Sequence, residues 1–277
     1  MAITTSSTLD DLFVNIVAQA RFTAEEQSLM LGLVTQYNIQ SQAGKTIQIP
    51  KYPAIAAASI AEGTDLSSTT VSTTKVEVTI GEVGAQVLLS DMATYGADSP
   101  ETAMGTLLGN AIATKMDQDL LALFSGFSFG LGAAGAEITV ADLFKAAAKL
   151  RANKVTGAIN AVVHPFQAYQ LKANLTNTFA NPNGGDLQNE AMRNGYVGTI
   201  AGMNVYESAN IVVDGSDDAV AAVFAPEALA IAIKRDFNLA PQRDESLRAW
   251  ELNATAVYGV GELDDSFGVK ITADAAL

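Results

Sequence analysis

The sequence contains no cysteine and only one histidine, His164, among its 277 residues. The absence of cysteine excludes disulfides, thiolate zinc sites and thiol nucleophiles. An activated nucleophile would therefore have to be a serine or threonine. The string Gly126-Phe127-Ser128-Phe129-Gly130 has the Gly-x-Ser-x-Gly spacing, but no predicted strand precedes it, as a nucleophile elbow requires. This chemical inventory argues against an enzyme.

Basic residues are also scarce. The chain has 16 lysines and arginines against 30 aspartates and glutamates, which gives a formal net charge of -14 and a pI near 4.4. Such a chain repels phosphate backbones, so we expect no sequence-driven binding of nucleic acid. The same acidity suits a surface that lies close to DNA without adhering to it.

Long apolar runs are absent as well. Spanning a bilayer takes about 18–20 apolar residues, and the best candidate, residues 107–124, is interrupted by Lys115, Asp117 and Asp119. The N-terminus lacks the basic and apolar regions of a signal peptide. We expect a soluble protein that is made in the cytoplasm and has no membrane partner.

Two alternating patterns predict a long β-hairpin at residues 43–90. Its strands are expected at 45–50 and 75–80, where apolar and polar side chains alternate. The segment between them is rich in Ala, Ser and Thr and offers little to bury. A hairpin this poor in core residues is only marginally stable alone in water. We therefore predict that it lies on another body, most simply another copy of the same protein.

A long helix is predicted at residues 99–125. Ser99 can cap it, and Pro100 suits its first position. At about 1.5 Å per residue the helix forms a rod of about 40 Å. Small residues recur every four positions on one flank, at Gly105, Gly109 and Ala113. This spacing favours the close packing of another backbone against that flank.

The remaining segments mix helix and strand patterns, which predicts an α+β fold. We expect N-terminal helices near residues 8–20 and 23–34, and a flexible glycine-rich connection at 126–135. A helix at 139–153 is capped by Thr139. The later elements are a strand at 159–163, a helix at 165–175, an exposed loop at 177–189, and extended segments at 203–206, 219–224, 229–234, 247–258 and 269–271.

Four patterns are candidates for a chemical site, and each fails a requirement. His164 has no nucleophile partner, so we predict a structural role for it. Residues 214–218 begin like a calcium loop, but Ala219 and Ala225 replace the required glycine and glutamate. The acidic cluster at 262–265 lacks complementary metal ligands. The glycines of 126–132 are not followed by the Gly-Lys-Ser/Thr of a phosphate loop. We predict no catalytic residue, no metal and no cofactor.

The order of these segments resembles the major capsid protein of tailed bacteriophages, which has the Hong Kong 97-type shell fold. The resemblance covers nearly the whole chain and rests on segment order rather than on a strict motif. The segments similar to that family are Gly44-Lys45-Thr46-Ile47-Gln48-Ile49-Pro50, Ala61-Glu62-Gly63-Thr64, Val162-Val163-His164-Pro165, Gly198-Thr199-Ile200-Ala201-Gly202-Met203-Asn204-Val205 and Val257-Tyr258-Gly259-Val260-Gly261.

The resemblance implies a division of the chain. Its segments are an N-terminal arm (1–42), an extended hairpin loop (43–90), a peripheral lobe with a long spine helix (91–138), an axial lobe (139–240) and the C-terminal strands of the peripheral lobe (241–277). It also implies a structural protein of the virion. This protein would self-assemble as pentamers and hexamers into an icosahedral head and enclose double-stranded DNA without binding it specifically.

The resemblance has implications for partners too. Because the arm begins close to Met1, the resemblance implies either a separate scaffolding protein or a chain supplied already processed, and the initiator Met1 favours the former. It also implies a portal. Lys51 and Lys75 are candidates for a crosslink between subunits by location only, and we do not claim a crosslink. Two alternatives stay open: a cellular nanocompartment shell, which has the same fold and encloses a cargo enzyme, and a soluble α+β enzyme that uses His164 or the acidic clusters.

Overall fold

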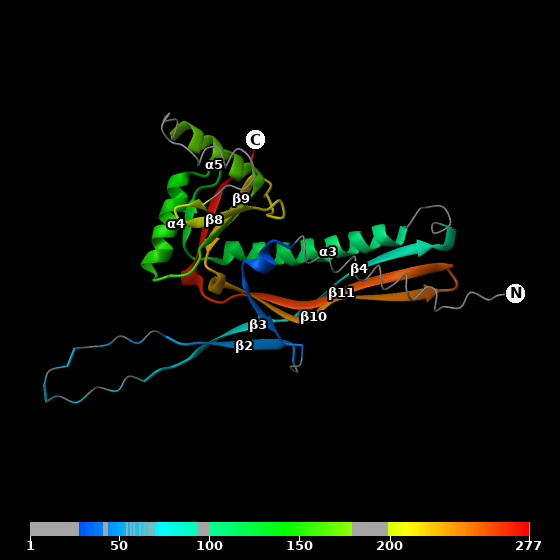
Figure 1. Ribbon diagram of the computed structural model, residues 1–277, viewed down its shortest axis with the longest axis horizontal. Coiled ribbons are helices and arrows are strands. Elements are labelled where there is room, and N and C mark those ends of the chain that lie inside the picture. Colours follow the sequence, from blue (N-terminus) through cyan, green and yellow to red (C-terminus); the bar gives the residue numbers. More distant parts are fainter. Residues whose placement is uncertain are drawn as a thin grey trace.

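The computed structural model describes residues 28–40, 44–92, 100–178 and 199–276, except hairpin positions 54, 56, 58, 61, 64, 66, 67 and 69 and the side chains of 100–103 and 174–178. Within these residues the chain builds two larger β-sheets with helices packed on them, and a two-stranded hairpin. The six-stranded sheet, with α4 and α5, stands at one end of a long four-stranded sheet along which α3 runs (Figure 1). The α+β class predicted from the sequence is confirmed.

The four-stranded sheet has the order β1-β10-β11-β4. Its two long central strands and β4 are antiparallel neighbours, whereas the short β1 pairs with β10 in parallel. The helix on this sheet is α3 (Pro100–Ala122), which continues into the 3-10 turn η2 (Leu123–Gly126). The strands are β1 (Thr35–Asn38), β10 (Leu229–Asp244), β11 (Ala249–Glu262) and β4 (Gly81–Ser90).

The six-stranded sheet has the order β5-β12-β9-β6-β8-β7 and mixes parallel and antiparallel pairs. Its strands are β5 (Gly130–Gly132), β12 (Gly268–Asp274), β9 (Asp218–Phe224), β6 (Asn160–Val163), β8 (Met203–Glu207) and β7 (Thr199–Ile200). Helices α4 (Val140–Ala152) and α5 (Pro165–Thr178) belong to this lobe. The 3-10 turns η3 (Pro226–Ala228) and η4 (Asp265–Phe267) lie where the chain passes between the sheets.

The two faces of the six-stranded sheet bury different cores. One face packs on the inward side of α4, which buries Leu143, Ala146, Ala147 and Leu150. Through the other face, Ala222 and Phe224 join the end of α3 and η2 in a core that continues under the four-stranded sheet. Phe124 and Phe224 lie in contact there, with ring centroids 5.4 Å apart. The two lobes therefore share one hydrophobic core.

Several predicted elements are confirmed within a few residues. Thr139 caps α4, since its Oγ1 accepts from the backbone N–H of Asp142 at 3.3 Å. Lys149 and Arg151 lie in the last turn of α4, where they complement the helix dipole. Gly105, Gly109 and Ala113 are all buried, as the small-residue flank of the long helix predicted.

The glycine-rich connection at 126–135 is not the flexible linker that the sequence predicted. Residues 130–132 form β5, which pairs in parallel with β12. Gly132 has φ of +75°, and a Cβ on it would lie 2.2 Å from the carbonyl oxygen of Thr272. Phe127 is fully buried, and a Cβ on Gly268 would lie 2.0 Å from its ring. These glycines allow close packing instead of flexibility.

The strand pairing also differs from the predicted division of the chain. β12, which was expected among the peripheral strands of 241–277, pairs with β9 in the six-stranded sheet. β10 begins at Leu229, inside the predicted axial segment 139–240, yet belongs to the four-stranded sheet, as does β4 from the predicted hairpin loop. Strand partners depend on contacts between distant residues, which the pattern of one segment does not reveal.

The predicted helix at 23–34 does not continue through the described residues. The 3-10 turn η1 (Met30–Gly32) is followed by β1, although Met30 and Val34 are buried as predicted. The predicted helix at 8–20, the cap at Ser99 and residues 179–189 of the predicted loop lie outside the described residues. Residues 177 and 178 of that loop belong to α5.

Candidate functional site: the hairpin and its anchorage

The base of the hairpin is anchored on its own subunit. β2 (Thr46–Lys51) and β3 (Thr74–Thr79) pair antiparallel, and their inward side chains pack against the four-stranded sheet. The buried members of this small core are Ile39, Val78, Ile80 and Ala232, and Tyr37, Ile47, Ile49 and Val257 pack around them. The expectation that the whole hairpin finds its core on another body is therefore wrong for its base.

Two glycines of β11 make this close approach possible. A Cβ on Gly259 would lie 2.4 Å from the carbonyl oxygen of Thr79, and a Cβ on Gly261 would lie 2.7 Å from Cγ2 of Val78. Both distances are too short for real atoms. The Gly259-Val260-Gly261 sequence is thus the surface on which the hairpin rests, a role that the sequence alone did not indicate.

Polar contacts also hold the hairpin base. Lys51 Nζ lies 2.7 Å from Asp264 Oδ2, and Lys234 Nζ donates to the carbonyl oxygen of Gly44 at 2.6 Å. Burial opposes the ionisation of Asp264, but hydrogen bonds from Lys51 and Ser266 outweigh it and lower the pKa of this carboxyl. Lys75, the other crosslink candidate, pairs with Glu77 at 2.7 Å. Both candidate lysines lie at the base of the hairpin, not at its tip.

The acidic cluster at 262–265 has partners within its own chain. Besides the contact of Asp264 with Lys51, Asp265 Oδ1 accepts from the backbone N–H of Ser128 at 2.6 Å. Burial raises the pKa of Glu262, and the neighbouring Asp265 carboxylate raises it further. Among the residues that the structure describes, no group of three or more His, Cys, Asp or Glu side chains is placed to hold a metal ion.

Beyond its base the hairpin exposes apolar side chains. We call this outer part, between the end of β2 and the start of β3 (residues 52–73), the tip of the hairpin. Figure 1 shows this part projecting well away from both sheets. Tyr52 is 70% exposed and Ile55 is 65% exposed, and Ile60 and Val71 are about half exposed at 48% and 45%. Apolar side chains gathered on one projecting arm are typical of a surface that another protein covers.

A buried carboxylate joins three parts of the chain. Asp117 of α3 is 1% exposed and accepts hydrogen bonds from Ser28 Oγ at 2.9 Å and from the backbone N–H groups of Leu29 and Met30 at 3.2 Å. Asn210 Nδ2 approaches its other oxygen at 3.4 Å. Burial raises the pKa of Asp117 against the effect of these hydrogen bonds. The carboxylate thus fixes the start of the described chain to the long helix. From the sequence alone, Asp117 was noted only as a charge that interrupts an apolar run.

His164 caps a helix. It immediately precedes α5, and its Nδ1 accepts from the backbone N–H of Phe166 at 3.4 Å. The side chain of Gln167 reaches back to accept from the backbone N–H of His164 at 3.2 Å, which completes a capping box. Burial lowers the pKa of His164. These contacts support the structural interpretation of this histidine.

Residues 214–218 form a turn in which carboxylates accept backbone N–H groups. Asp214 Oδ1 accepts from Ser216 and Asp218 at 2.8 and 3.0 Å, and Asp218 Oδ1 accepts from Gly135 at 2.7 Å. Such contacts stabilise an Asx-type turn.

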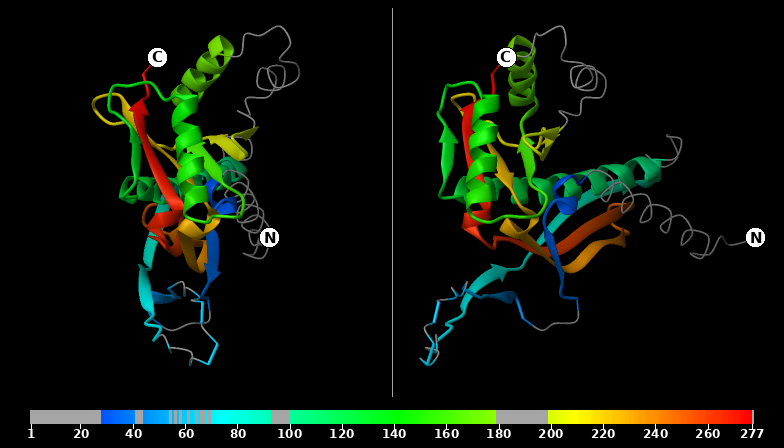
Figure 2. Two further views of the ribbon diagram at one scale, coloured as in Figure 1. Left: turned by 90° about the vertical axis from the view of Figure 1, so that its left-hand side faces the viewer. Right: turned by 60° about the vertical axis from the view of Figure 1, so that its left-hand side comes forward.

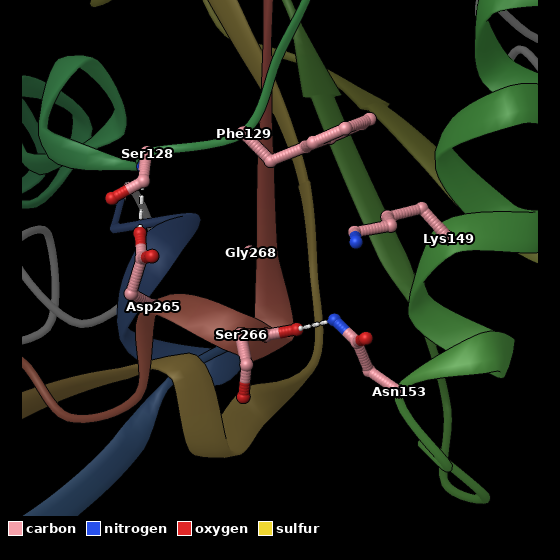
Figure 3. Close-up of a pocket in the computed structure, with 7 residues that line it drawn as sticks. All are labelled: Ser128, Phe129, Lys149, Asn153, Asp265, Ser266 and Gly268. Carbon is pink, nitrogen blue, oxygen red and sulfur yellow. Dashed lines mark hydrogen bonds between the residues drawn. The ribbon is translucent and has the colours of Figure 1, made fainter.

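A cavity of about 320 Å³ lies between the end of α4 and η4 (Figure 3). Asn153 Nδ2 donates to the carbonyl oxygen of Ser266 at 2.6 Å, and Lys149 Nζ lies 4.9 Å from the centroid of the Phe129 ring. The lining residues are Ser128, Phe129, Lys149, Asn153, Asp265, Ser266 and Gly268. Of the two serines, Ser266 donates its hydroxyl to Asp264 Oδ1 at 2.6 Å, and among the described residues no hydrogen bond joins the Ser128 hydroxyl to Lys149 or Asp265. No helix in the described part of the chain is long and apolar enough to cross a membrane.

The fold and these surfaces define a structural subunit: two lobes on one core, and an arm whose apolar tip is uncovered. The chain matches the family described as phage capsid protein over residues 52–271. It therefore belongs to that family. No curated protein matches it.

Solved capsids have a similar fold. The capsid structure of cyanophage P-SCSP1u matches with a TM-score of 0.74 at 16% identity, covering 90% of this chain and 89% of that one. The capsid of Ralstonia phage GP4 has a TM-score of 0.70 at 15% identity, with 88% and 87% covered. A structure from Mycobacterium phage Che8 has a TM-score of 0.65 at 20% identity, with 83% and 85% covered.

The family and the fold together confirm three predictions. The chain has the Hong Kong 97-type fold, it is a major capsid protein located in the virion, and it is a structural protein rather than an enzyme. Membership of a phage capsid family also favours the phage shell over the nanocompartment alternative. As a capsid protein it assembles with copies of itself.

Proposed function

We propose that this subunit builds an icosahedral phage head as pentamers and hexamers, and that the hairpin is a strap between neighbouring subunits. The observation that supports a strap is the difference between the base of the hairpin, which is fixed, and its tip, which is exposed. Its base is fixed by a core, two glycines and the Lys51–Asp264 ion pair. Its tip exposes Tyr52 and Ile55. A rigid base directs the tip outward. Burying the uncovered apolar tip on a neighbouring subunit lowers the free energy of the assembly.

The same proposal assigns a position in the shell to each of the two lobes. The four-stranded sheet with α3 is the peripheral lobe, and the six-stranded sheet with α4 and α5 is the axial lobe, which meets its copies around the five-fold and six-fold axes. The N-terminal arm, residues 1–42, includes Ser28, whose hydroxyl donates to Asp117 of α3. The net charge of -14 lets the shell enclose DNA without specific binding. A separate scaffolding protein and a portal complete the assembly.

The strap is tested by making its tip polar. We would combine Tyr52→Ser, Ile55→Ser and Ile60→Ser. These exposed side chains contribute little to the subunit core, so the variant subunit should fold and melt like the parent. Burying each such side chain contributes about 1.5–3 kcal/mol, and this contribution is repeated at every strap. We therefore expect few or no closed particles by electron microscopy.

The matched control keeps the apolar tip and changes its charge, with Glu62→Gln and Asp65→Asn. Both residues are exposed in the same segment, and this variant should form normal shells. Normal particles from the triple serine variant would contradict the strap. Failure of the parent chain to form closed particles under any assembly condition would contradict the shell itself.

A further inference from the structure

The outward face of α4 is built to be covered. The inward face packs on the six-stranded sheet, while Phe144 on the opposite side is 53% exposed. Small residues surround this ring on the exposed face, namely Ala141, Ala148 and Ala152. A protruding aromatic ring among alanines leaves room for another surface to approach the helix closely.

The same face is positively charged in an otherwise acidic chain. Residues 140–154 contain four basic side chains and one acidic side chain, a local net charge of +3, whereas the whole chain has -14. Lys145 is paired with Asp142 at 2.9 Å. Arg151 and Lys154 are exposed and have no acidic partner among the described residues. The guanidinium group of Arg151 and the ammonium group of Lys154 are therefore available to a partner.

A complementary surface lies elsewhere on the same lobe. The turn before β9 and the segments after β5 and β12 are joined by backbone hydrogen bonds, from Ala275 to Asp217 at 2.6 Å and from Asp274 to Ala136 at 2.8 Å. Besides the buried Asp218, its acidic side chains are Glu137, Asp214, Asp217 and Asp274, of which Asp214 and Asp274 accept backbone N–H groups. None of these four has a basic partner in the part of the chain that the structure describes. Val212, beside this edge in sequence, is 74% exposed.

The two surfaces lie on different sides of the lobe. Figure 1 shows α4 on the left side and the turn between β8 and β9 on the right, and in the left view of Figure 2 α4 faces the viewer while this turn lies to the left, beside β12. They therefore do not pair within one subunit. Two complementary surfaces on different sides of one chain make a heterologous contact, which closes into a ring when the rotation between copies allows it.

We propose that the outward face of α4 docks on the acidic edge of the next copy around the symmetry axis, so that a ring of these contacts closes each capsomer. This proposal rests on the proposed pentamers and hexamers and names the contact between their axial lobes. Arg151 and Lys154 meet Glu137 and Asp217 of the neighbouring copy, and Phe144 packs on its apolar residues. Charge complementarity sets the direction of the ring and suppresses contacts between like faces.

A second copy fits this face better than DNA does. Phosphate contacts need cations and polar donors along the backbone. Arg151 and Lys154 supply two cations at one end of this face, but the exposed Phe144 and the alanines around it offer no polar donor. One of the nearby cations, Lys149, is already placed over the Phe129 ring. The chain supplies the acidic surface that the helix requires, so no other partner is needed.

The absence of cysteine allows a direct test. We would introduce Ala148→Cys at the centre of the α4 face and Ser216→Cys in the acidic turn, both exposed positions, and treat assembled particles with a short bis-maleimide. Each subunit then carries both halves of the contact. We expect a ladder on a denaturing gel that ends at pentamers and hexamers. Each single cysteine variant is the control and should give no species beyond dimers.

Charge exchange gives a second readout. The variant Arg151→Glu with Lys154→Glu should reduce the yield of closed particles about tenfold through like-charge repulsion. Glu137→Lys with Asp217→Lys should do the same. Combining all four substitutions restores opposite charges across the contact and should recover assembly. If the four substitutions together are no better than either pair, the proposed contact is wrong.

The outcomes separate this contact from the shell. Closed particles without a crosslinked ladder would overturn the contact and leave the shell standing. The variant with Arg151→Glu and Lys154→Glu could form normal particles that package less DNA. This result would show that α4 faces the genome, and it would also overturn the proposed contact. Failure of the cysteine-free parent to form particles would count against the proposed shell.

Discussion

Replacing Gly259 with alanine should detach the base of the hairpin from the sheet on which it rests. The added Cβ would lie 2.4 Å from the carbonyl oxygen of Thr79, 2.9 Å from its carbonyl carbon and 3.2 Å from Cα of Ile80. All three are backbone atoms, so no side-chain rotation relieves the overlap. The junction between β3 and β4 has to move by about 1 Å to restore ordinary van der Waals contact.

The cost follows from what this movement disturbs. Val78 and Ile80 lie on either side of the clash and are both buried in the small core at the hairpin base. Overpacking of this kind costs about 1–3 kcal/mol. For a chain of this size, a loss of about 2 kcal/mol lowers Tm by about 4–8 °C. Because the hairpin base also sets the direction of the strap, closed particles should become fewer.

The measurements are thermal unfolding of the unassembled subunit and hydrogen exchange of the β3 amides. Gly81→Ala is the matched control, because a Cβ there meets no atom within 4 Å and needs no unusual backbone conformation. It lies in β4, which pairs with β11, the strand that carries Gly259. An unchanged Tm together with unchanged amide protection in Gly259→Ala would refute the role assigned to this glycine.

The remaining predictions concern buried polar groups. Asp117→Ala leaves the N–H groups of Leu29 and Met30 without their acceptor, so the free energy of unfolding in denaturant should fall by about 3 kcal/mol. Asp117→Asn keeps one acceptor oxygen and should lower this free energy by less. Equal losses in the two variants would contradict the hydrogen-bond account. The pKa of His164 is lowered by burial, so below about pH 6.5 the unfolded chain takes up a proton more readily than the folded chain and stability falls with falling pH. His164→Asn keeps a capping side chain and should flatten this dependence between pH 6.5 and 5, whereas an unaltered slope would show that other groups cause it.

The sequence was most informative about local structure. Hydrophobic periodicity located α4 and the long helix, and the cap at Thr139 marked the start of α4 to the residue. These features depend on neighbours within about four positions, so a single segment contains the information. Composition was equally direct about function: without cysteine and with one histidine, few chemical sites were open to this chain.

Sequence reasoning missed the residues whose role depends on distant partners. Asp117 was noted only as a charge that interrupts an apolar run, because its partners, Ser28 and Asn210, are 89 and 93 positions away. Gly259 looked like part of a strand because Thr79 lies far from it in the chain. A glutamine three residues after a possible cap was the available sign of the box formed by His164 and Gln167.

The sequence by itself determined that this chain has helices and strands of these approximate lengths, an acidic surface, and a hairpin with too little core to stand alone. The tertiary structure decided where that core is found. Pairing between β12 and β9, and contact between Gly259 and Thr79, join residues far apart in the chain. Such contacts depend on the simultaneous fit of many segments, which no local pattern encodes. Only the assembled fold therefore shows that the hairpin base rests on its own subunit and that its apolar tip remains exposed.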